Sequence, residues 1–241
     1  MPTAVVTGAG IRIGKAIALA LAEAGHDLVL HVHRSSQGAE EVAEEARALG
    51  RTVTLLRADL GTREGVESLA AAVLEAHPSL DVLVNNAGIF ERLAFEEITR
   101  EQYHRMMGIN LEAPFFLTQA LLPALRAAPQ PLVVNLTDIG GERAESHYAH
   151  YSVSKAGLIM LTRALAVELA PQVRVNAISP GTVVFPEDFD EAARQATLAR
   201  IPLGRVGSAE DVARVVVFLA REAPYISGQV IAVDGARSAQ L

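Results

Sequence analysis

The chain of 241 residues contains no cysteine and no tryptophan. Without cysteine it can form neither disulfide bonds nor thiolate metal sites. Long hydrophobic runs are also missing, because the apolar stretch 212–220 includes Arg214 and is far too short to span a bilayer. The N-terminus runs from Met1 directly into an apolar segment, without the charged and hydrophobic regions of a secretion signal. These absences predict a soluble, cytoplasmic protein.

Lysine is scarce as well, since only Lys15 and Lys155 among the 21 basic residues are lysines. The net charge of −7 and an isoelectric point near 5.5 argue against a nucleic-acid or anionic-membrane surface. His31 and His33 form a candidate ligand pair, but without a third ligand they do not predict a metal site. We therefore expect a small-molecule ligand, with no metal, nucleic acid or membrane.

Half of the residues are hydrophobic, and two kinds of segment alternate along the chain. Apolar runs predict strands at residues 3–7, 27–32, 52–57, 81–84, 132–136, 173–178 and 229–233. Helical periodicity marks residues 15–24, 38–49, 63–76, 101–127, 151–170 and 209–221. The alternation predicts one α/β domain over residues 1–241, a doubly wound Rossmann fold with a seven-stranded parallel sheet and helices on both faces. The irregular stretch 182–205 follows the sixth strand, where such a fold places a lid over its ligand.

A glycine-rich turn follows the first predicted strand and reads Thr7-Gly8-Ala9-Gly10-Ile11-Arg12-Ile13-Gly14. Such a turn lets the backbone approach a pyrophosphate and lets the next helix aim its N–H groups at it. The acidic residue that often binds an adenosine ribose about twenty residues later is absent, and His33-Arg34-Ser35 stands there. The segment is either a solvated loop or a site for a 2′-phosphate, which a carboxylate would repel and Arg34 and Ser35 would bind. We favour the second interpretation, which predicts NADPH rather than NADH.

Tyr151 and Lys155 lie four residues apart, on one face of a predicted helix. A tyrosine with its ordinary pKa of about 10 is a poor acid-base group at neutral pH. We expect the neighbouring ammonium to favour the phenolate and to lower the pKa of Tyr151 toward the working range. The pair alone is typical of many helix surfaces, so its meaning depends on the motifs around it.

Together these motifs resemble the short-chain dehydrogenase/reductase family over essentially the whole chain. The family pattern TGxxxGxG, NNAG, a helix asparagine, YxxxK and a PG turn corresponds here to residues 7–14, residues 85–88, Asn110, Tyr151 with Lys155, and Pro180-Gly181. The resemblance implies that the cofactor is bound by Gly8, Arg12, Ile13, Gly14, His33, Arg34, Ser35, Asp59, Leu60, Asn86, Ala87, Gly88, Tyr151, Lys155, Pro180 and Gly181. It also implies a homotetramer built through the helices at 101–127 and 151–170.

Two departures narrow the resemblance. Arg12 replaces the middle glycine of the loop, and Asp138 replaces the usual catalytic serine thirteen residues before Tyr151. Both changes are similar to the pteridine reductase branch, which reads TGxxxRxG and uses Asp-Tyr-Lys. The segment 31–35 also resembles the NADPH-binding segment of that branch. Gly88 departs from the branch, whose best-known members carry serine there, so the contacts at this position need not match.

The branch resemblance implies an NADPH-dependent reductase of an oxidised pterin. Its implied substrate-binding residues are Arg12, Phe90, Asp138, Tyr148 and Tyr151, with Phe90 stacking the pterin against the nicotinamide. Tyr151 then supplies a proton, Lys155 positions the nicotinamide ribose, and Asp138 orients or reprotonates Tyr151. Asn110 holds a helix open for a proton-relaying water.

Two alternatives remain. One is a carbonyl reductase such as a 3-oxoacyl-thioester reductase, in which Asp138 merely replaces serine; a carboxylate is, however, a worse partner than a hydroxyl for a developing oxyanion. The other is a catalytically idle NADP-sensing or scaffold protein, against which the presence of Asn110, Tyr151 and Lys155 argues. Single residues also have plainer interpretations: Phe90 as core, Arg12 as a surface ion pair, and Asp138 as a loop cap.

Overall fold

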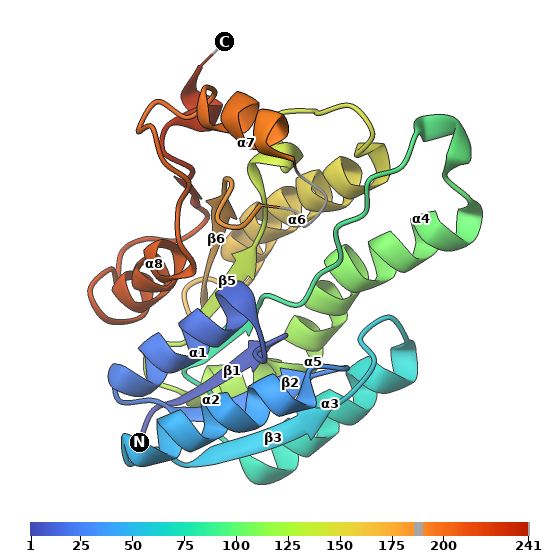
Figure 1. Ribbon diagram of the computed structural model, residues 1–241. Helices are drawn as coiled ribbons and strands as arrows, with labels where there is room; N and C mark the ends of the chain where they lie inside the picture. Colours follow the sequence, from blue (N-terminus) through green and yellow to red (C-terminus); the bar gives the residue numbers. More distant parts are fainter. Residues whose placement is uncertain (186–189, 241) are drawn as a thin grey trace.

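The computed structural model describes residues 1–185 and 190–240, and Figure 1 shows their arrangement. In this part of the chain seven parallel strands form one sheet in the order β3-β2-β1-β4-β5-β6-β7. The strands are β1 (Thr3–Thr7), β2 (Asp27–Val32), β3 (Val53–Arg57), β4 (Val82–Asn85), β5 (Leu132–Leu136), β6 (Arg174–Pro180) and β7 (Val230–Val233). Each lies within two residues of its predicted position, and the predicted Rossmann fold is confirmed.

Helices cover both faces of the sheet (Figure 1). One face packs on α1 (Arg12–Glu23), α2 (Ser36–Ala48) and α8 (Ala209–Arg221). The other face packs on α3 (Arg63–Ala76), α5 (Ala113–Ala127) and α6 (Ala149–Glu168). Every residue of β1, β4 and β5 is buried, because a strand that is covered on both sides has no solvent-facing residue. The strand order reverses between β1 and β4, and a ligand crevice opens there at the carboxyl ends of the strands.

The long helix that the sequence predicts at 101–127 is wrong in its middle. The structure has α4 (Arg100–Met107), a π-helical turn at Gly108–Glu112, and then α5. Pro114 has no N–H and cannot donate to the Asn110 carbonyl four residues earlier, so a regular α-helix loses a bond at this point. The Asn110 side chain is instead committed to neighbouring segments.

The predicted lid at 182–205 contains a helix that the sequence analysis did not predict, α7 (Glu191–Leu198). Its eight residues are too few for a clear periodic pattern. The Asp190 side chain accepts a bond from the Ala193 N–H at 2.8 Å and caps the helix. Residues 186–189 of this segment lie outside the described residues.

Candidate active site

The glycine turn is held in a conformation that suits a dinucleotide. Gly8 has a φ of +65°, in the left-handed region that favours glycine, and a Cβ added at Gly14 would lie 2.1 Å from the Gly8 carbonyl oxygen. The residue before α1 is Ile11, which makes no side-chain capping bond, so the first N–H groups of the helix remain available to an anion. The turn therefore fits the pyrophosphate of a dinucleotide.

The NNAG segment, residues 85–88, is joined to this turn by hydrogen bonds. The Asn86 side chain donates to the Thr7 and Gly8 carbonyl oxygens at 2.8 and 3.1 Å. In return the Thr7 hydroxyl accepts bonds from the Asn86 and Ala87 N–H groups, both at 2.9 Å. Sequence reasoning did not single out Thr7. Its signal is a hydroxyl residue at the last position of an otherwise apolar strand, directly before the glycine turn.

His31 is a second anchor; the sequence analysis placed it in a segment that resembles a cofactor-binding one but predicted no bond to the glycine turn. Its Nδ1 accepts a bond from the Gly8 N–H at 3.3 Å, and its Nε2 lies 3.1 Å from the Ala58 carbonyl oxygen. Both bonds require the neutral ring with its hydrogen on Nε2. Burial lowers the pKa of His31 and favours that neutral form. The ring thus links the glycine turn to the segment that begins with Asp59 and Leu60.

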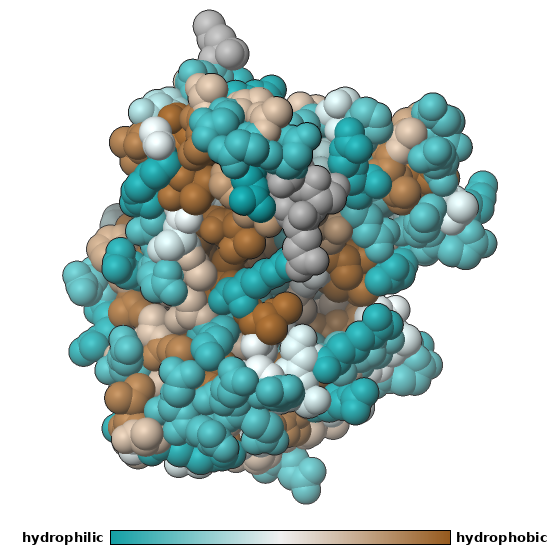
Figure 2. Space-filling view, in the orientation of Figure 1, coloured by the Kyte–Doolittle hydropathy of each residue, from teal (hydrophilic) through white to brown (hydrophobic). Residues whose placement is uncertain are grey.

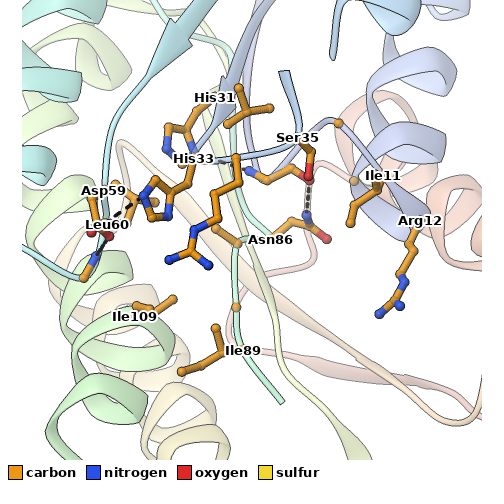
Figure 3. Close-up of a pocket in the computed structure, with 18 of the residues that line it drawn as sticks. Ile11, Arg12, His31, His33, Ser35, Asp59, Leu60, Asn86, Ile89 and Ile109 are labelled. Atoms are coloured by element: carbon orange, nitrogen blue, oxygen red, sulfur yellow. Dashed lines mark hydrogen bonds and ion pairs between the residues drawn. The ribbon is translucent and has the colours of Figure 1, made fainter. Parts of the chain in front are cut away.

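A cavity of about 650 Å³ lies along this turn (Figure 3). On one side His33 faces Asp59, with Nε2 and Oδ2 3.8 Å apart, and Arg12 lies on the opposite side. The cavity brings together twelve of the predicted cofactor residues: Gly8, Arg12, Ile13, Gly14, His33, Arg34, Ser35, Asp59, Leu60, Asn86, Ala87 and Gly88.

A second cavity, of about 680 Å³, adjoins the first, and the two share Arg12, Ile13, Asn86, Gly88 and Ile89 in their walls. Figure 2 shows this side of the molecule hollowed at its centre, with hydrophobic residues in the hollow. The remaining cofactor and substrate candidates line this second cavity: Phe90, Asp138, Tyr148, Tyr151, Lys155, Pro180 and Gly181. The groove for a long ligand therefore opens into a chamber that holds the Tyr151 and Lys155 pair.

Asn110 lines neither cavity and is buried beneath them. Its Oδ1 accepts a bond from the Ile89 N–H at 2.9 Å, and its Nδ2 donates to the Ile89 carbonyl at 3.0 Å and to the Ser154 hydroxyl at 3.1 Å. Ser154 in turn donates to the Tyr151 carbonyl at 2.7 Å. Asn110 thereby ties the segment after NNAG to the helix that carries Tyr151.

Lys155 is buried, and its Nζ donates to the Leu136 carbonyl at 2.8 Å. Burial lowers the pKa of Lys155 to about 8, against the opposing charge of Asp138. Its ammonium lies 5.8 Å from the centre of the Tyr151 ring. Asp138 accepts a bond from the Gly140 N–H at 2.6 Å, so it does cap the turn that follows β5 while its carboxylate also lines the chamber.

The expected lowering of the pKa of Tyr151 is wrong. Burial raises the pKa of Tyr151 well above its ordinary value, and the neighbouring Asp138 carboxylate raises it further. Burial also raises the pKa of Asp138, while the Gly140 N–H and Lys155 oppose that shift. The phenol of Tyr151 therefore keeps its proton at neutral pH.

Two aromatic rings stand at the chamber wall. Phe90 stacks on Tyr148, with ring centres 4.7 Å apart and an interplanar angle of 19°, and meets Tyr151 edge-on at 4.8 Å. Phe90 is 53% exposed, so the interpretation of this side chain as core is wrong. Phe90 and Tyr148 form an apolar wall beside the phenol, and the Tyr151 ring is steeply inclined to both, by 85° and 67°.

Comparison with known proteins agrees with this geometry. The family model described as enoyl-(acyl carrier protein) reductase matches residues 8–236. The 3-oxoacyl-(acyl-carrier-protein) reductase FabG of Thermotoga maritima is 35% identical over 234 residues, which cover 95% of each chain. The chain belongs to the short-chain dehydrogenase/reductase family. L-rhamnose 1-dehydrogenase (NAD(P)(+)) of Azotobacter vinelandii is 36% identical, over 97% of this chain and 95% of that protein.

Solved structures of short-chain dehydrogenases share the whole fold. One from Burkholderia cenocepacia, in complex with NADP, has 31% identity and a TM-score of 0.92, over 98% of this chain and 97% of that one. Acetoin dehydrogenase from Salmonella typhimurium has 29% identity and a TM-score of 0.91, over 100% and 97% of the two chains.

This short-chain dehydrogenase/reductase is thus an NAD(P)-dependent oxidoreductase acting on a small molecule. The relatives are named for carbonyl and alcohol substrates and give no support to the pteridine reductase branch. Within residues 1–185 and 190–240, no helix is both long and apolar enough to cross a membrane.

Proposed function

We propose that this chain is an NADPH-dependent reductase of a carbonyl compound, such as a 3-oxoacyl thioester. The observation that carries the proposal is the position of the Tyr151 phenol, beside the buried Lys155 in the chamber that adjoins the cofactor groove. Reduction of a carbonyl group needs a proton donor at the oxygen, and a phenol with a raised pKa is held in the donor form. When it is bound, the reduced nicotinamide supplies the hydride.

The choice of NADPH over NADH rests on the segment after β2. Arg34 is exposed, lines the groove, and makes no ion pair among the described residues. The Ser35 side chain precedes α2 but makes no capping bond, so its hydroxyl is free to donate. A guanidinium beside a free hydroxyl is a suitable site for a 2′-phosphate.

Three further residues take supporting roles in this proposal. Lys155, whose Nζ is held by the Leu136 carbonyl, would donate to the ribose that carries the nicotinamide, and Asn110 keeps the Tyr151 helix in place. Asp138 lies beside the Tyr151 hydroxyl and holds it in position.

A second candidate substrate is an oxidised pterin, which four particular residues favour. Asp138 can accept bonds from the ring and amino nitrogens of a pterin. Phe90 and Tyr148 offer a stacking surface, and Arg12 adopts a φ of +50° at the junction of the two cavities. Similarity along the whole chain favours the carbonyl substrate, whereas these local features favour the pterin.

The oxidation of NADPH with an acetoacetyl thioester, with dihydrobiopterin and with dihydrofolate, measured side by side, tests the proposal. Turnover of the thioester above both pterins supports carbonyl reduction, and the reverse order supports pterin reduction. If none of the three substrates is reduced although the protein binds NADPH, the result would support the alternative of a catalytically idle, NADP-sensing protein.

We also propose a homotetramer. Apolar side chains are exposed along α5 and α6, and they are Phe115, Phe116, Val153, Met160 and Val167. Exposed apolar side chains on these two helices favour association with further copies of the chain. Light scattering at a defined concentration would show four chains if this is right.

A further inference from the structure

The second cavity is cationic, although the chain as a whole is acidic. Among the described residues its walls carry five cations and two carboxylates, a formal balance of +3, against −7 for the whole protein. The cations are Arg12, Arg143, Lys155, Arg200 and Arg237; the carboxylates are Asp138 and Glu145. A cleft with a charge opposite to that of the rest of the molecule attracts ligands of one sign.

Three of these cations lie away from the cofactor groove. Arg143, Arg200 and Arg237, which we call the arginine rim, line the second cavity and not the first. They come from separate segments: Arg143 follows the 3-10 turn Ile139–Gly141, Arg200 follows α7, and Arg237 begins the 3-10 turn Arg237–Ala239. Binding of cofactor phosphates therefore does not account for their position.

Within the described part of the chain, Glu145 is the one carboxylate paired with the arginine rim. Glu145 lies 3.2 Å from Arg200 and 3.6 Å from Arg237, through different oxygens. Arg143 is exposed at the cavity wall and forms no ion pair within residues 1–185 and 190–240. A purely structural role, in which Glu145 fastens α7 and the C-terminal turn, explains two of the arginines but leaves a surplus positive charge.

One member of the rim is already held in place. The Arg237 side chain is only 18% exposed and donates to the Thr182 hydroxyl at 2.7 Å. Its charge reaches Asp138, where it lowers the pKa of that carboxyl against the effect of burial. A guanidinium fixed in this way forms bonds to an oxyanion at a small entropic cost.

We propose that the physiological substrate carries an anionic group, a carboxylate or a phosphate, which the arginine rim binds while the reacting carbon lies beside Tyr151. Both anions match the fork of a guanidinium, so the rim chemistry does not depend on which of them is present. The inference relies on the proposed reductase activity only for the place of the reacting carbon.

Matched substrate pairs provide the test. Acetoacetyl-coenzyme A is anionic through phosphates and acetoacetyl-N-acetylcysteamine is neutral; dihydrofolate is anionic through carboxylates and dihydrobiopterin is neutral. For whichever pair is turned over, we expect kcat/KM to favour the anionic member by about tenfold or more at low ionic strength. The preference should shrink as salt rises, because an exposed rim is screened.

The double variant Arg143→Gln/Arg200→Gln should lose about tenfold more in kcat/KM on the anionic member than on the neutral one, chiefly through KM. Arg163→Gln is the matched control, because Arg163 pairs with Glu142 at 4.0 Å and lies outside both cavities. It should leave the ratio between the two members unchanged. If kcat/KM is equal for both members in the parent protein and the double variant does not change it, the arginine rim does not bind an anionic group of the substrate. The proposed reductase activity would stand.

If none of the four compounds is reduced, the proposed reductase fails and the rim is tested by binding alone. Calorimetry with the NADP-loaded protein should then show acetoacetyl-coenzyme A or dihydrofolate binding more tightly than its neutral counterpart, with loss of that difference in Arg143→Gln/Arg200→Gln. Equal affinities for the two members of each pair would show that the arginine rim does not bind an anionic group.

Discussion

The Asp138 carboxylate lies beside the Tyr151 hydroxyl and raises the pKa of that phenol, in the same direction as burial does. The Nζ atom of Lys155, on the same helix, lies 5.8 Å from the centre of the Tyr151 ring, and burial lowers the pKa of Lys155 to about 8. Tyr151 is therefore held in its protonated, phenol form. A proton donor, rather than a preformed phenolate, is what a reductase needs at the start of a turnover.

Tyr151→Phe should reduce kcat by a factor on the order of 100 to 10,000 while NADPH still binds, because the proton donor is lost and the groove is retained. Tyr148→Phe is the matched control and should be much milder, since that hydroxyl has no lysine four residues beyond it. Steady-state rates and NADPH fluorescence titrations would check both. Greater damage from Tyr148→Phe would contradict the assignment of the donor.

Asp138→Asn should move the alkaline limb of the pH–rate profile to lower pH. The Asp138 charge raises the pKa of Tyr151 and also opposes the lowering of the pKa of Lys155, so its removal lets both groups lose their protons at lower pH. The donor form of Tyr151 is then lost earlier as pH rises. An alkaline limb that stays in place or moves upward would show that Asp138 does not act on this pair.

Asp138→Ser separates the two substrate classes. A hydroxyl donates to a carbonyl oxygen but cannot accept two bonds from a pterin as a carboxylate does. We expect this variant to lose pterin reduction and to keep or gain activity on a 3-oxoacyl thioester. Rates on both substrates for the parent and the variant decide the matter: a parent that prefers the thioester, together with unchanged pterin reduction in Asp138→Ser, would exclude the pterin as the natural substrate.

Arg34→Asp should reverse much of a preference for NADPH that we expect to be at least about tenfold, since a charge-assisted phosphate contact is worth about 1.4 kcal/mol or more. The exposed Arg47 of α2 lies outside the groove, so Arg47→Gln should leave the preference as it is. Equal KM values for NADPH and NADH in the parent protein would contradict the prediction.

The affinity for NADH should fall as the pH drops through the pKa of His31, which burial lowers below the ordinary histidine value of about 6.5. A protonated His31 points an N–H donor at the Gly8 N–H, so the bond between them is lost. Because burial lowers the pKa of His31, the neutral ring and its bond to Gly8 are fully present above the ordinary histidine pKa. His33 and Asp59 are the charged groups that act on the ring, the first favouring the neutral form and the second opposing it. NADH is the probe because it lacks the titrating 2′-phosphate.

His31→Asn retains an acceptor near Gly8 but cannot titrate, so its affinity for NADH should be nearly flat from pH 7 to 5. His31→Gln extends toward Ala58 instead and should bind several-fold more weakly at every pH, since it loses a bond worth about 1 kcal/mol. His33→Asn controls for the neighbouring histidine. Persistence of the acid decline in His31→Asn would place its origin elsewhere.

Local motifs and the hydrophobic pattern were enough to predict the sheet and the location of the site. The runs in β1 and the glycine turn carry that information within a few residues of sequence. The direction in which the pKa of Tyr151 is shifted was not predictable, because it depends on how deeply the phenol is buried and on the Asp138 carboxylate, thirteen residues earlier in the chain. The arginine rim joins residues 143, 200 and 237, whose proximity exists only after folding.

The π-helical turn at Gly108–Glu112 also determines which side chains of the following helix, α5, face the sheet. Each extra residue turns the following part of a helix by about 100°. The phase that results points Leu117 and Leu121 into the core and leaves Phe116 outside. Deletion of a single residue from this turn would therefore rotate α5 on the sheet, exposing leucines and forcing phenylalanine rings inward, even though every residue of α5 itself remained unchanged.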